Sequence, residues 1–366
     1  MFPRKVTAVL LISVVSAVAN SQIPGGGRSA PLASAGGIGV GQPFVVGNRL
    51  IYFAVKGGND GYVALDRTNG RVAWRLELKD YEDFATDGQQ LWTVTAGATP
   101  ASPVVLRVDT ATGQTHQLVT WTRGYPFISA GMAHAGRNLY VLTIAMDGVT
   151  IRGDVLCIDP YSGNVVWQNT RDVKAEAGVP LIFGLLRVRG ANLVYSVGRD
   201  IWAVRLTDGV TVDHQQETGI IQADPAKDDP GEGPVYYAND RGEIVSYNPA
   251  LKTLQRFRAP ERDRSRLLVR AGILFSHNSS ALFAHALNAG LKWRVQGKFL
   301  AEVYDDSSRS LWAFRDDNVL LRIDASTGKI LHQQSTIWRP LMFNVLGQEF
   351  YAVTSDGRAY SVKLQN

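Results

Sequence analysis

Two segments of the chain place arginine and aromatic residues just before a proline-led apolar run. Arginine can bind a carboxylate through two N–H groups, and an aromatic ring can stack on a flat molecule. Together these side chains would suit a planar anionic ligand. The alternative is that they are packing and solvated rim residues, because pockets need several converging groups. The segments contain Trp121, Arg123 and Tyr125 before Pro126, and Trp338 and Arg339 before Pro340.

The histidines do not form a metal-binding motif. His277 and His285 are the closest pair, and the sequence contains neither H-x-H nor H-E-x-x-H. The acidic stretch 223–234 could offer carboxylates to calcium, but its spacing differs from that of an EF-hand loop. We therefore expect no metal site, and we interpret 223–234 as a solvated acidic loop.

A second charged segment, residues 256–270, contains six arginines interleaved with Glu261 and Asp263. Such a segment could contact an anionic surface. No series of aromatic residues for base stacking accompanies it, so we expect no nucleic-acid partner. The simplest interpretation is a charged loop that joins two structural repeats.

No motif for catalysis emerges from the rest of the chain. There is no G-x-S-x-G elbow, no paired-carboxylate motif and no phosphate-binding loop. The single cysteine, Cys157, excludes an intramolecular disulfide, and the net charge of +5 is too small to indicate a partner. These observations favour a protein that is not an enzyme.

An internal repeat organises most of the sequence. An apolar stretch ends in aspartate, glycine follows four residues later, and an aromatic residue often follows four residues after that. Asp can close a turn through backbone N–H groups, Gly can adopt positive φ, and Trp can pack between sheets. The aspartates of the clear copies are Asp66, Asp109, Asp159 and Asp324, and weaker copies give equivalent positions 206, 248, 286 and 363.

Each copy is preceded by short β-branched and aromatic runs that are typical of strands, such as LIYFAV from residue 50 and LWAFRD from residue 311. Eight units spaced by 38 to 50 residues predict an all-β fold, a β-propeller of eight four-stranded blades. A seven-bladed ring with one irregular unit is the alternative. The last unit has only three strands, so an N-terminal segment must complete it or leave it short.

The N-terminus resembles an export signal. Arg4 and Lys5 precede an apolar run from Val6 to Val18, and small residues follow. We therefore expect a signal peptide over 1–19, a flexible Gly/Ser/Pro-rich lead-in over 20–41 and the propeller over 42–366. No cysteine near the cleavage site could accept a lipid, so we expect no stable membrane insertion after cleavage.

The copies ALDRTNGRVAW (64–74) and CIDPYSGNVVW (157–167) resemble the repeat of the pyrroloquinoline-quinone (PQQ)-type β-propellers. That family includes quinoprotein alcohol and sugar dehydrogenases, an outer-membrane assembly lipoprotein and exported binding propellers. Many of the dehydrogenases are longer and hold the quinone beneath a ring of two adjacent cysteines. This chain has one cysteine and no C-x-x-C-H haem motif, so the resemblance implies the scaffold more strongly than the activity.

The sequence thus predicts an exported, monomeric, non-catalytic propeller, periplasmic or secreted, that binds a protein or other macromolecular partner in the cell envelope. The alternative is a small quinoprotein dehydrogenase that uses PQQ with calcium to oxidise alcohols or sugars. Its candidate cofactor-binding residues would be Trp121, Arg123, Tyr125, Trp338 and Arg339.

Overall fold

The computed structural model describes sixteen stretches of the chain. Within them every regular element is a β-strand, and none contains a helix long and apolar enough to cross a membrane. The expected signal peptide, 1–19, lies outside the described residues. The described residues are 33–34, 38–39, 43–56, 59–78, 83–99, 101–121, 127–175, 185–217, 221–222, 233–239, 241–258, 268–270, 272–287, 289–346, 349–355 and 358–363.

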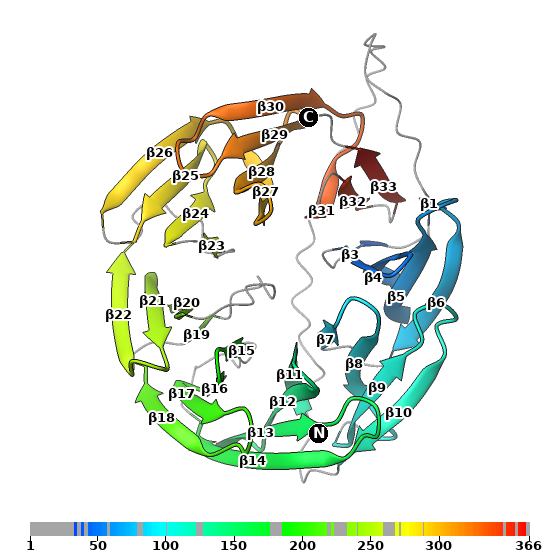
Figure 1. Cartoon of the computed structure of the whole chain (residues 1–366), viewed down its shortest axis with the longest axis vertical. Coiled ribbons are helices and arrows are strands. Elements are labelled where there is room, and N and C mark those ends of the chain that lie inside the picture. The colour runs from blue at the N-terminus through cyan, green and yellow to red at the C-terminus, as the bar shows by residue number, and fades with distance from the viewer. Residues whose placement is uncertain are drawn as a thin grey trace.

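Eight antiparallel sheets form a ring around a central axis (Figure 1). This confirms the prediction of an eight-bladed β-propeller and removes the seven-bladed alternative. In blades 2 to 7 four consecutive strands run from the axis outward, so the first strand is innermost and the fourth lies at the outer edge (Figure 1).

The six regular blades are as follows. Blade 2 contains β7 (Asp83–Thr86), β8 (Leu91–Ala96), β9 (Pro103–Val108) and β10 (Thr115–Thr120), and blade 3 contains β11 (Phe127–Ala135), β12 (Asn138–Met146), β13 (Thr150–Ile158) and β14 (Val165–Lys174). Blade 4 contains β15 (Leu186–Arg189), β16 (Asn192–Val197), β17 (Asp200–Arg205) and β18 (Thr211–Gln216), and blade 5 contains β19 (Ile221–Gln222), β20 (Val235–Asn239), β21 (Glu243–Asn248) and β22 (Thr253–Arg258). Blade 6 contains β23 (Leu268–Arg270), β24 (Ile273–His277), β25 (Ala281–Ala286) and β26 (Gly290–Gln296), and blade 7 contains β27 (Phe299–Asp305), β28 (Ser310–Arg315), β29 (Val319–Asp324) and β30 (Ile330–Ser335).

Blades 1 and 8 close the ring with strands from both ends of the chain. In blade 1, β2 (Ile38–Gly39) and β3 (Phe44–Val46) both pair with β4 (Arg49–Lys56), which is followed by β5 (Asn59–Asp66) and β6 (Val72–Leu78). Blade 8 contains β31 (Pro340–Leu346), β32 (Glu349–Thr354), β33 (Arg358–Lys363) and, at its outer edge, β1 (Ala33–Ser34). The N-terminal segment therefore completes the last blade, although β1 and β2 lie within the stretch expected to be a flexible lead-in.

The core lies between neighbouring blades, because side chains alternate between the two faces of each sheet. One cluster joins Tyr140 and Val155 of blade 3 to Tyr195 and Trp202 of blade 4, all of them buried. Comparable clusters occupy the other junctions. Each blade is thus held by two apolar faces.

Antiparallel pairing sorts the turns onto the two edges of the ring. Within a blade, the turns from first to second strand and from third to fourth strand lie at one edge. The turns from second to third strand and the connections to the next blade lie at the other. We name the first edge the turn rim and the second the connection edge. Trp121, Trp338 and Arg339 of the arginine–aromatic segments belong to the connection edge.

Candidate functional site

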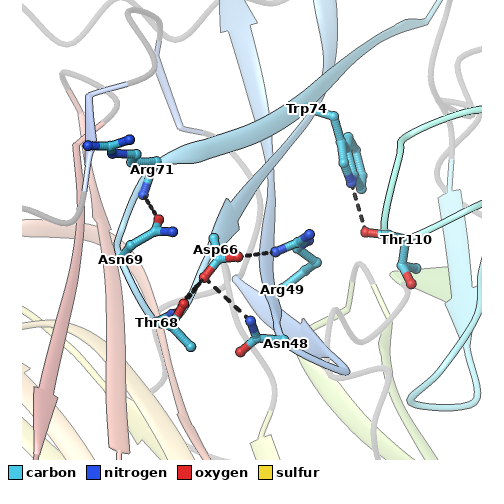
Figure 2. A network of polar contacts seen from close by, with 8 residues as sticks. All are labelled: Asn48, Arg49, Asp66, Thr68, Asn69, Arg71, Trp74 and Thr110. Carbon is cyan, nitrogen blue, oxygen red and sulfur yellow. Dashed lines mark hydrogen bonds and ion pairs between the residues drawn. The ribbon is translucent and has the colours of Figure 1, made fainter.

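The repeated aspartate and glycine build a tight turn on the turn rim (Figure 2). The backbone N–H of Thr68 donates to Asp66 Oδ1 (2.8 Å), and the N–H of Gly70 donates to the Asp66 carbonyl (2.8 Å). Hydrogen bonds from the Thr68 hydroxyl and N–H lower the pKa of Asp66 far below its usual value. Gly70 has φ 70°, in the left-handed region where glycine carries no steric cost.

The tryptophan that follows this turn anchors its blade to the next one. Trp74 Nε1 donates to the Thr110 carbonyl in the third-to-fourth turn of blade 2 (2.8 Å; Figure 2). A Cβ on Gly113 would lie 2.7 Å from Trp74 Cγ, so the indole packs directly on this glycine. Trp167 and Trp293 make the same bond to the carbonyls of Leu206 and Ala325, each at 2.9 Å. The structural interpretation of these tryptophans is confirmed.

Trp121 and Trp338, two of the predicted ligand residues, lie at separate blade junctions. Trp338 is 5% exposed at the junction of blades 7 and 8, with Phe314, Phe350 and Tyr360 stacked on it at centroid distances of 5.2 to 5.8 Å. Arg339 is exposed.

Trp121 packs on the core between blades 2 and 3, and its buried Nε1 has no hydrogen-bond partner among the described residues. Arg123 and Tyr125 lie outside the described residues.

The described members of this set do not fit PQQ with calcium. The rings that stack on Trp338 belong to the core, and Trp121 lies at a junction that is not adjacent to it. Within the described ranges no group of three or more His, Cys, Asp or Glu could hold a metal ion. Cys157 is buried on β13, where it pairs with Trp167 of β14. Burial raises the pKa of its thiol to about 11.

The charged residues singled out in the sequence make contacts between blades. Arg256 Nη2 donates to the buried Glu217 Oε1 of blade 4 (3.0 Å), and Tyr237 OH donates to the same oxygen (2.7 Å). Burial, together with this bond, raises the pKa of Tyr237. His277 Nδ1 lies 2.7 Å from Glu302 Oε2 of the next blade. The residues 259–267 join blades 5 and 6 and lie outside the described residues, as do 223–232.

Exposed apolar side chains gather on the turn rim. Of eleven large exposed hydrophobic residues in the described ranges, nine lie in or just after the third-to-fourth turn of a blade. They come from six of the eight blades. Val149 and Ile337 are the two exceptions, and both lie on the connection edge. The nine are Val72, Tyr161, Val165, Val166, Val210, Leu251, Leu291, Ile330 and Leu331.

Sequence reasoning missed this rim, although a signal for it exists. The residue one or two positions after the turn glycine is apolar in several repeats: Val72 follows Gly70, Val165 follows Gly163, and Ile330 follows Gly328. The position resembles an ordinary strand residue in the sequence. Only the blade topology shows that it lies at an unpaired outer edge.

Comparisons with known proteins agree with the fold. A sequence model of the family described as outer membrane protein assembly factor BamB matches residues 82–252. Among solved structures, BamB from Moraxella catarrhalis is 14% identical with a TM-score of 0.57, covering 91% of this chain and 99% of that one. Sqt1 from Saccharomyces cerevisiae is 12% identical with a TM-score of 0.59, covering 93% and 98%.

A europium-containing methanol dehydrogenase is 12% identical with a TM-score of 0.58, covering 91% of this chain and 84% of that one. At these identities the structural likeness shows the fold alone. A search of curated protein sequences finds no match.

Proposed function

We propose that this chain, a PQQ-like β-propeller, is an exported, non-catalytic binding protein of the cell envelope that contacts a protein partner through its turn rim. The observation that carries the proposal is the concentration of exposed apolar side chains on that rim. Single exposed hydrophobic residues are normal on a soluble protein, but their collection along one edge is typical of interaction sites.

The ring supports a binding role physically. Each blade is held on both sides by buried clusters, so residues on the rim are presented by a fixed frame and lose little freedom on binding. Closure leaves no whole blade face to be covered by another copy, which favours a monomer. The match to a family described as an outer membrane assembly factor favours a protein partner in the envelope.

Location follows from the N-terminal signal expected over residues 1–19 and from the lack of a cysteine near its cleavage site. We place the mature chain in the periplasm or outside the cell, without stable membrane insertion. The modest charge and the pairing of Arg256 with Glu217 leave no support for nucleic acid.

The proposal is tested by cross-linked affinity capture of the tagged full chain from envelope extract. A triple variant, Val166→Asp, Leu251→Asp and Leu331→Asp, puts charges on the rim. We expect the amount of partner that it captures to be about tenfold lower than with the wild type. The matched control, Val149→Asp with Ile337→Asp, carries its charges on the connection edge and should capture as the wild type does. Equal capture by all three chains would refute the rim as the binding surface.

The alternative of a PQQ-dependent dehydrogenase has a separate test. Purified protein is incubated with PQQ and calcium, and dye-linked oxidation of alcohols and sugars is followed. We expect no change in quinone absorbance and no turnover, because the described candidate residues do not converge. Turnover that depends on added PQQ would overturn the non-catalytic proposal.

A further inference from the structure

At three blade junctions an indole occupies the same place between the blades. We call this place the slot. On the fourth strand of blade 1, Trp74 lies opposite Ala64 of the third strand; Trp167 lies opposite Cys157 in blade 3, and Trp293 lies opposite Ala284 in blade 6. Each indole crosses to the next blade and donates to a backbone carbonyl there. Register thus defines a slot position in every blade.

In blade 5 the slot position holds Gln255. It pairs with Ser246, as Trp74 pairs with Ala64, and its side chain is exposed. The junction of blades 5 and 6 therefore has no indole of its own at this place. Around Gln255 the structure contains a cavity of about 230 Å³, open to the surface. Its lining residues include Tyr236, Phe257 and Leu287.

The turn glycine of blade 6 differs from its equivalents at the filled junctions, because no indole packs on it. At the filled junctions, a Cβ on Gly113, Gly209 or Gly328 would meet the indole at 2.7 to 2.8 Å. The third-to-fourth turn of blade 6 is one residue shorter, and its glycine is Gly290. No heavy atom outside its chain neighbours lies within 4 Å of a Cβ built on Gly290.

The acceptor that the other tryptophans use has an equivalent here. The N–H of Leu287 donates to the carbonyl of Gly272, as the N–H groups of Leu206 and Ala325 donate to Ala191 and Arg309. Leu206 and Ala325 are the residues whose carbonyls accept indole N–H groups. Leu287 therefore takes their place and lines the cavity. Among the described residues, none of those that line the cavity is charged, so it suits an uncharged ring with one donor.

We propose that this slot binds the side chain of a tryptophan presented by the protein partner. The inference rests on the proposed function for the source of the indole, and it deepens that function by naming the group that is recognised. Leu251 belongs both to the slot and to the apolar turn rim, so the site is continuous with the proposed contact surface. The bound indole would stand where Trp74, Trp167 and Trp293 stand at their own junctions.

The slot is tested without the partner. N-acetyl-tryptophanamide is titrated into the full chain by calorimetry, with the N1-methyl derivative as a probe that lacks the donor. We expect one site, with the methylated probe about fivefold weaker because one hydrogen bond is lost. In Gln255→Trp the chain fills its own slot, so binding should fall at least about tenfold, and the thermal midpoint should rise.

A matched control, Gln168→Trp, adds an exposed tryptophan to the face of β14 opposite to Trp167 and should bind as the wild type does. Equal binding by wild type and Gln255→Trp, or no binding by the wild type, would overturn the slot. Partner capture separates this failure from that of the proposed function. A partner captured equally by wild type and Gln255→Trp leaves the rim proposal standing and refutes the slot.

Discussion

Each tryptophan anchor joins two blades by using both properties of its ring. The indole face packs on the turn glycine of the next blade, and the N–H satisfies a carbonyl that the turn leaves unpaired. A phenyl ring could supply part of the packing but not the donor. The anchor therefore combines apolar burial with a bond that a buried carbonyl needs.

Replacing Trp74 by Phe should lower stability by about 2 kcal/mol, because the partly buried Thr110 carbonyl loses its donor and the smaller ring leaves space. The denaturant midpoint measures this. Val72→Ala, at an exposed position two residues earlier, is the control and should change the midpoint little. Equal effects for the two variants would contradict the anchor.

Two turn glycines allow the effect of backbone strain to be compared with the effect of a steric clash with an indole. Gly328 and Gly136 both have positive φ, 75° and 60°, so alanine is strained at either position by roughly 1 to 2 kcal/mol. Only at Gly328 would the new Cβ also meet Trp293, 2.7 Å from Cγ. Gly328→Ala should therefore lower the thermal midpoint clearly more than Gly136→Ala. Equal losses would show that the indole does not need the glycine.

The aspartate of the turn predicts a pH dependence. Hydrogen bonds from Ser326 and Thr327 lower the pKa of Asp324 to about 2, below its unfolded value near 4. The ionised carboxylate therefore stabilises the fold above about pH 4, and this contribution is lost as the pH falls from 4 toward 2. Asp324→Ala should be less stable than the wild type at pH 7, with the difference shrinking below pH 4. A difference that is constant down to pH 3 would contradict this assignment.

Residues of the repeat were predictable because their roles are local. Asp66, Gly70 and Trp74 lie within nine positions, and the turn chemistry fixes each of them. The role of the arginine–aromatic segments could not be predicted in this way. Whether Trp121 and Trp338 lie close together depends on the positions of their blades in the ring. The same limit applies to Gln255: a vacant slot is visible only when the register places it opposite Ser246.

At the scale of the elements, the closing junction differs from the three junctions that are anchored by Trp74, Trp167 and Trp293. Blade 8 ends in β1, whose two residues pair with Ala359 and Arg358 and carry no tryptophan. Instead, Arg67, in the turn of blade 1, donates to Tyr351 OH (2.8 Å) and to the Glu349 carboxylate on β32. A polar contact thus takes the place of the indole where the two ends of the chain meet.

The closing contact can be measured by a double-mutant cycle of Arg67→Ala and Glu349→Ala. Both side chains are about 30% exposed, so solvent reduces the strength of the pair. We expect a coupling free energy of up to about 1 kcal/mol in thermal or denaturant unfolding. Arg71→Ala, another arginine in the same turn, serves as the control partner. Strict additivity of the Arg67 and Glu349 changes would contradict the contact.

Most strands were predictable from short runs of β-branched and aromatic residues, because the middle strands of a blade, such as β8 and β28, are buried on both faces. The exceptions are β1 and β2, which are two residues long and lie in a stretch rich in glycine. Neither segment is long enough to show a strand pattern in the sequence. Their strand character comes from the open edges of β33 and β4, to which they pair.

At the scale of the whole molecule, the residues that pack the core and the exposed apolar residues lie in different parts of the ring. The aromatic residues of the connection edge, in particular Trp338, serve the core, whereas exposed apolar side chains mark the turn rim. We propose that a propeller with this distribution presents its turn rim to a partner and keeps its frame unchanged on binding. Such an arrangement would distinguish a binding scaffold from an enzyme whose chemistry lies at the channel.

Site-specific photo-cross-linking in intact cells tests this claim most directly. A photoreactive amino acid is placed at Val166 or Leu251 on the turn rim, and at Val149 or Ile337 on the connection edge. We predict adducts with one protein from the rim positions and none from the connection edge. Adducts confined to Val149 and Ile337, or none at any position, would contradict the account.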